Sequence, residues 1–84
     1  MNCVILTPEK EAFSGEVKAV HVPGLSGRFE VLENHANIVS ALGKGSVKLI
    51  ESGGGDIQID IQKGFLEVLN NKVSLFIQEV NSDS

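Results

Sequence analysis

The chain has 84 residues and a net charge of −4, which suits one compact domain and leaves no room for two. Its Lys and Arg residues stand singly, without the basic patch that a nucleic-acid or anionic-lipid binder needs. No apolar run approaches the roughly 18 residues of a membrane span, and the single cysteine, Cys3, cannot form an internal disulfide. We therefore expect a soluble, cytoplasmic-side protein with no nucleic-acid partner and no direct membrane insertion.

The first half of the chain is predicted to form short strands joined by polar segments. Cys3 is expected to be a small hydrophobic residue on the first strand. In "EVKAVHV", residues 16–22, the apolar phase shifts midway, which predicts a β-bulge near Lys18–Ala19. The best helix candidate is "NHANIVSAL", residues 34–42, and the glycine that follows limits it to one turn.

The second half alternates with a period of two, which is typical of half-buried strands. "DIQIDIQ", residues 56–62, places its isoleucines on one face, and "VSLFIQEV", residues 73–80, carries Phe76 as an apolar residue on the opposite face. "ESGGGD", residues 51–56, predicts a flexible hairpin connection. Asn70–Asn71 predicts a tight hairpin turn, because Asn tolerates left-handed backbone conformations.

Roughly eight or more short strands at this spacing predict an all-β fold, an antiparallel sandwich or barrel. The domain is expected to span residues 1–80, and "NSDS", residues 81–84, is expected to be a polar tail.

Catalytic and metal sites are poorly supported. A nucleophile–base pair needs a Ser, Thr or Cys beside an oriented His, and His21 lies between two valines, where a structural imidazole is the expected role. Structural zinc needs closely spaced Cys and His pairs, and Asp56 and Asp60 lack the pattern of a calcium loop. The glycines of residues 52–56 are followed by neither a Lys-Ser pair nor a helix, so they predict no phosphate site. We expect no catalytic residue, metal or cofactor.

The polar segment within "SGRFEVLENHANIV", residues 26–39, interrupts the apolar pattern. One interpretation is a solvated connection in which the side chain of Asn34 or His35 holds backbone groups. The other is a loop that binds a partner. The polar side chains concerned are Arg28, Glu30, Glu33, Asn34, His35 and Asn37. From these residues alone, the chain is predicted to be a small β-sandwich interaction module.

An ordered set of short motifs covers nearly the whole chain, and together they resemble the N-terminal domain of the epsilon subunit of F-type ATP synthase. Each motif is weak alone, whereas the set in this order is specific. The motifs fall on Phe13-Ser14-Gly15, Gly24 and Gly27, His35-Ala36, Ala41-Leu42, Gly45, Gly64 to Val68, and Asn71.

The resemblance implies a flattened sandwich of two mostly antiparallel five-stranded sheets. It implies a non-catalytic rotor subunit of the central stalk that links the gamma subunit to the c-ring and couples rotation to ATP synthesis. Such a subunit is peripheral, on the cytoplasmic face of the bacterial inner membrane or the equivalent organellar face. The residues expected at the interface with gamma and the c-ring are Arg28, Phe29, Glu33, Asn34 and His35.

Many members of that family continue into a C-terminal helical hairpin that can inhibit ATP hydrolysis, so this sequence is expected to work without that hairpin. The alternative to the stalk role is a free-standing β-sandwich module that binds another protein, and a small hydrolase is a third, weaker hypothesis. The stalk role also predicts that the isolated chain exposes an apolar surface for gamma.

Overall fold

The computed structural model describes residues 1–80, so the predicted polar tail at 81–84 lies outside the described residues. The described part of the chain forms strands and no helix, which confirms the all-β class. The strands are β1 (Asn2–Leu6), β2 (Glu11–Gly24), β3 (Gly27–Leu32), β4 (Ile38–Leu42), β5 (Gly45–Glu51), β6 (Asp56–Leu69) and β7 (Lys72–Glu79).

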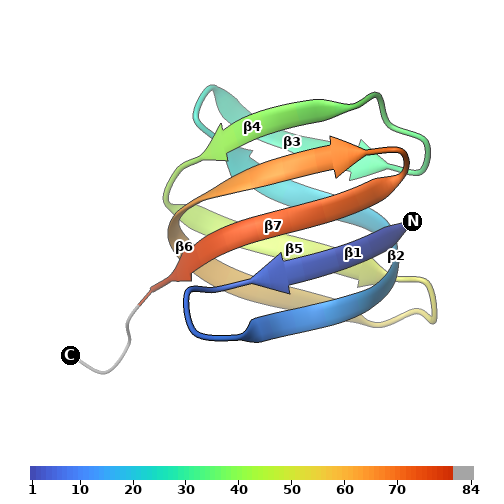
Figure 1. The fold of residues 1–84 in the computed structure, drawn as a ribbon, viewed down its shortest axis with the longest axis horizontal. Helices are drawn as coiled ribbons and strands as arrows, with labels where there is room; N and C mark the ends of the chain where they lie inside the picture. Colours follow the sequence, from blue (N-terminus) through green and yellow to red (C-terminus); the bar gives the residue numbers. More distant parts are fainter. Residues whose placement is uncertain (81–84) are drawn as a thin grey trace.

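The strands form two face-to-face layers, one in front of the other in Figure 1. The pairings give the front layer the order β4, β6, β7, β1, β2, and the back layer the order β3, β2, β5, β6. β2 and β6 occur in both layers because each is long enough to cross between them. The molecule is correspondingly flat, with principal extents of 38 × 28 × 19 Å. The predicted sandwich is therefore confirmed.

Hydrogen bonds link all seven strands into one mixed sheet, so the predicted division into two five-stranded sheets is not confirmed. Within residues 1–80, β1 and β7 pair in parallel and the other strand pairs are antiparallel. The seven strands are fewer than the eight or more predicted. The reason is that residues 56–62 and 65–69, predicted as separate runs, both belong to β6, where a register shift interrupts the alternation without ending the strand.

The helix predicted within residues 34–42 is wrong, since Ile38–Leu42 forms β4. Each of its residues has a partner on β6, and the β-branched side chains of Ile38 and Val39 suit a pleated sheet. The bulge near Lys18–Ala19 is confirmed by a register shift between β2 and β5 at this point. Both hairpins are also confirmed; Asn70 and Asn71 adopt φ values of 49° and 63° between β6 and β7.

The core lies between the two layers. Leu66 on β6 and Leu75 on β7 face each other in register and are fully buried, as is Leu49 from the back layer. Each such leucine contributes about 2 to 3 kcal/mol through the hydrophobic effect. Cys3 is fully buried as well, as predicted for a small hydrophobic residue, and burial raises the pKa of its thiol to about 12.

Candidate interaction surfaces

An apolar groove of about 560 Å³ crosses the outer face of the front layer. Its floor follows one row of the sheet, because the registers place Leu6 opposite Phe76, and Phe65 between Phe76 and Ala41. Phe65 is 56% exposed and Phe76 is 47% exposed. Adjacent exposed aromatic side chains are typical of a surface that binds another molecule. The apolar surface predicted for the isolated chain is therefore present.

Close approach of β6 and β7 fixes the shape of this groove. A Cβ atom at Gly64 would stand 2.5 Å from the carbonyl oxygen of Phe76, closer than real Cβ atoms come. The position therefore needs glycine. Lys63 and Gln78 line the groove next to the aromatic row, so its rim is polar.

The turn between β2 and β3 forms a second, smaller cleft with β4, of about 290 Å³. Leu25 and Val39 on its walls are each 72% exposed, and Phe29 lines it beside them. Arg28 follows the turn, and its Nη1 donates a hydrogen bond to the Ser46 carbonyl at 2.8 Å. We call residues 24–29, with Val39 and Lys44, the β2–β3 tip.

The structure divides the predicted interface residues into two groups. Arg28 and Phe29 lie at the start of β3, in the β2–β3 tip. Glu33, Asn34 and His35 follow the end of β3, in the connection to β4. At about 3.3 Å per residue, the strand separates Arg28 from Glu33 by about 16 Å. One small partner loop cannot contact both groups.

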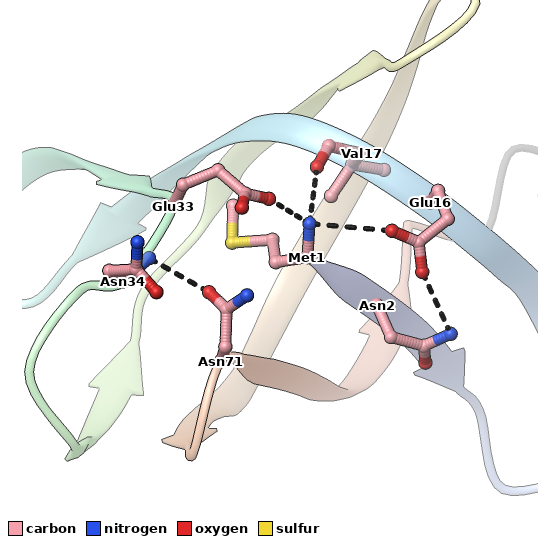
Figure 2. A network of polar contacts seen from close by, with 7 residues as sticks. All are labelled: Met1, Asn2, Glu16, Val17, Glu33, Asn34 and Asn71. Carbon is pink, nitrogen blue, oxygen red and sulfur yellow. Dashed lines mark hydrogen bonds and ion pairs between the residues drawn. The ribbon is translucent and has the colours of Figure 1, made fainter.

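A polar network surrounds the amino group of Met1 at the end where β3 finishes (Figure 2). The ammonium donates hydrogen bonds to the Val17 carbonyl, at 3.1 Å, and to the Glu33 carboxylate, and it lies 3.5 Å from the Glu16 carboxylate. The hydrogen bond with Glu33 raises the pKa of the amine and lowers the pKa of the carboxyl. Glu33 is thus engaged within its own chain.

The connection between β3 and β4 is held against the turn between β6 and β7. The backbone N–H of Asn34 donates to Asn71 Oδ1, and the backbone N–H of Asn70 donates to Asn37 Oδ1, each at 2.8 Å (Figure 2 shows the first bond). His35 Nδ1 lies 2.8 Å from the carbonyl of the next residue. Asparagine side chains do hold backbone groups here, but they are those of Asn37 and Asn71. Of the two side chains that the first interpretation named, Asn34 and His35, only His35 contacts a backbone group within residues 1–80.

Sequence reasoning missed the groove. Its strongest signal was Phe76, an apolar residue on the outward face of an alternating strand. Phe65 gave no comparable signal, because only the register shift in β6 decides which face it occupies. Neither residue was predicted at an interface.

The histidines of the described chain do not build a nucleophile–base pair. His21 Nε2 lies 2.9 Å from Glu30 Oε2, and its cross-strand neighbours are Glu30 and Lys48, with no hydroxyl or thiol. Within residues 1–80, no group of three or more His, Cys, Asp or Glu side chains is placed to hold a metal ion. The same residues contain no helix of the length and apolar character that crossing a membrane requires.

The model of one protein family matches residues 1–82: the ATP synthase, Delta/Epsilon chain, beta-sandwich domain. The chain belongs to this family. Its relatives include the ATP synthase epsilon chain of Chlorobaculum tepidum, 44% identical over 77 residues, and that of Chlorobium limicola, 42% identical over the same length. Each match covers 92% of this chain and 88% of the relative. The family assignment confirms the resemblance found in the sequence.

Other members of the family are longer. The epsilon chain of Clostridium botulinum (strain Eklund 17B) is 35% identical, and the match covers 86% of this chain but 54% of the relative. Among solved structures, a chain of the Euglena gracilis mitochondrial ATP synthase (OSCP/F1/c-ring) superimposes with a TM-score of 0.85 at 24% identity, covering 92% of this chain and 49% of that one. A chain of the Tetrahymena thermophila enzyme (central stalk/c-ring) gives 0.75 at 17% identity, covering 94% and 63%. These two likenesses establish the shared fold.

Proposed function

We propose that the chain is a non-catalytic central-stalk subunit of a proton-translocating F-type ATP synthase. It links the gamma subunit to the c-ring, so that rotation of the ring reaches the catalytic subunits as torque. It is peripheral, held on the cytoplasmic face of the bacterial inner membrane, or the equivalent organellar face, through the complex. The membership of the family and the names of the relatives support this role.

The observation that carries the proposal is the aromatic groove of the front layer. A part that transmits torque needs a contact that does not slip, and desolvated aromatic residues at the centre of an interface supply such contacts. Phe65 and Phe76 stand about half exposed on a hydrogen-bonded pair of strands, so little backbone entropy should be lost when they are covered. We assign this groove to gamma.

We assign the predicted interface residues to two subunits, because β3 separates these residues into two groups. Arg28 and Phe29, with the β2–β3 tip, are assigned to the c-ring. Glu33, Asn34 and His35, at the opposite end of β3, are assigned a smaller contribution to the contact with gamma, because the Glu33 carboxylate and the Asn34 backbone N–H are already bonded within the chain. Polar contacts of this kind set register and specificity more than affinity.

Gentle solubilisation of membranes tests the role directly. The chain, tagged at its C-terminus in its own cells, should be recovered with gamma, the alpha and beta subunits, and c, identified by mass spectrometry. Recovery of the chain alone, or with unrelated soluble proteins, would contradict the stalk role. That result would favour the alternative, a free-standing β-sandwich module whose groove binds a different protein.

A further inference from the structure

The β2–β3 tip carries positive charge that the described residues do not neutralise. The Arg28 guanidinium has five N–H donors, and Nη1 donates to the Ser46 carbonyl at 2.8 Å. Neither Arg28 nor Lys44 takes part in an ion pair within residues 1–80. This local excess of positive charge stands out because the whole chain has a net charge of −4.

Arg28 and Lys44 come from different connections that meet at the same end of the sandwich. The backbone N–H of Gly43 donates to the Pro23 carbonyl at 2.8 Å, and Leu25 Cδ2 would lie 3.2 Å from a Cβ atom at Gly43. Arg28 Nη1 would lie 3.9 Å from a Cβ atom at Gly45. Lys44 therefore stands between two residues that border the turn, and both cations are exposed.

The acidic residues closest in register leave the two cations available. Glu30 follows Arg28 by two positions on the same face of β3, and its carboxylate is paired with His21 at 2.9 Å. Asp60 lies opposite Ser46 between β5 and β6, and no ion pair joins it to Arg28. The turn itself, Gly24–Gly27, has no charged side chain.

An apolar cleft adjoins these cations. Leu25 and Val39 form its walls and are each 72% exposed, with Phe29 beside them. A free phosphate or a phosphate headgroup would use the cations and leave these apolar side chains in water. A protein segment with a carboxylate beside an apolar side chain would use both.

We propose that the β2–β3 tip binds an acidic loop of another subunit, whose carboxylate pairs with Arg28 and Lys44 while a neighbouring apolar side chain enters the cleft between Leu25 and Val39. The inference rests on the proposed stalk function for the presence of that subunit, and it adds the chemistry of the contact. A guanidinium can bind a carboxylate through two parallel hydrogen bonds, which fixes the orientation of the loop as well as its charge.

Charge reversal in the assembled complex tests the contact. Membranes that carry tagged Arg28→Glu should retain the chain about tenfold less than wild type after washing at about 0.15 M salt, because a carboxylate then faces a carboxylate. Arg28→Lys preserves the charge and should stay within about threefold of wild type. Lys72→Glu, an equal change of charge at the opposite end of the sandwich, is the matched control and should be retained like wild type. Retention of Arg28→Glu equal to wild type would overturn the proposal.

Zero-length coupling identifies the carboxylate. A water-soluble carbodiimide joins an amine to a carboxyl group in contact with it, with loss of water to the reagent as a urea. In wild-type membranes it should join Lys44 Nζ to an Asp or Glu of another subunit, and the product should vanish in Lys44→Arg. Coupling of Lys44 only within this chain, or no coupling, would overturn the assignment. Failure of the wild-type chain to copurify with the synthase subunits would instead reject the stalk function.

Discussion

The two ends of the sandwich both carry polar segments, and they differ in how far those polar groups are bonded within the chain. At the tip end, the Arg28 side chain makes one hydrogen bond within residues 1–80 and lies beside exposed apolar side chains, and the aromatic groove begins at the adjoining part of β4. At the amino-terminal end, the polar groups of Glu33, Asn34 and Asn37 are bonded within the chain. A polar segment is therefore a stronger candidate for an interface where its groups lack internal partners. We therefore expect the tip end to supply most of the contacts with other molecules and the amino-terminal end mainly to hold the fold.

The largest expected effect comes from a substitution in the aromatic groove. Phe65→Asp places a charge at the centre of the groove and should weaken association with the solubilised complex by at least about 30-fold, since loss of a central aromatic residue costs about 2 kcal/mol or more. The isolated chain should unfold at nearly the same urea concentration as wild type, because Phe65 is 56% exposed. Copurification and urea unfolding measure the two properties separately.

Leu69→Asp is the matched control for this substitution. Leu69 is 51% exposed, and it lies on the same strand and the same outer face as Phe65, but near the amino-terminal end. It should leave association within a few-fold of wild type. Equal losses for Phe65→Asp and Leu69→Asp would show that the whole face, and not the groove, carries the contact.

A smaller and opposite pattern is expected at the amino-terminal end. Asn37→Ala removes the acceptor for the Asn70 N–H and should lower the free energy of unfolding by about 1 kcal/mol, the usual value of one hydrogen bond. Association with the complex should not change. Asn37→Asp keeps an acceptor oxygen at this position and should recover most of the stability, measured by urea unfolding. Loss of association in Asn37→Ala at full stability would show that this end contributes as much to the interface as the tip end.

Much of the fold could be predicted from the sequence because a half-buried strand alternates apolar and polar residues. The isoleucines of residues 56–62, the bulge near Lys18–Ala19 and the Asn70–Asn71 turn each carry a local signal, and each was confirmed. The helix predicted at 34–42 was wrong because this stretch lacks such a local signal. A five-residue strand such as β4 is too short to show its period, and its pairing with β6 decides its conformation.

The candidate surfaces were harder to predict, because they depend on which residues meet across the sheet. The row from Leu6 to Ala41 joins residues of four strands through their registers, and no local pattern encodes a register. The Met1 network joins the start of the chain to Glu33 in the same way. The sequence marked residues 26–39 as unusual, yet it could not show that, within residues 1–80, Arg28 forms no ion pair whereas Glu33 is paired with the Met1 amine.

The smallest expected effect is a pH dependence confined to the amino-terminal end. Glu33 holds the pKa of the Met1 amine above its ordinary value of 8.0, so the folded chain keeps this proton more tightly than the unfolded chain. That contribution to stability is complete below pH 8 and is lost as the pH rises through the raised pKa. The ammonium holds the pKa of Glu33 below its ordinary value of 4.5, so this second contribution is complete above pH 4.5 and is lost as the pH falls through the lowered pKa.

The pair therefore stabilises the fold most fully between pH 4.5 and pH 8, and both shoulders of the stability profile should depend on it. Glu33→Gln keeps an oxygen acceptor but no charge, so it should lower the plateau and flatten both shoulders in urea unfolding measured from about pH 3 to pH 10. Glu9→Gln removes a carboxylate far from the network and should leave the shape of the profile unchanged. If Glu33→Gln lowers stability equally at every pH, the contribution of Glu33 does not come from the charge of the pair, and the pH dependence assigned to this end is wrong.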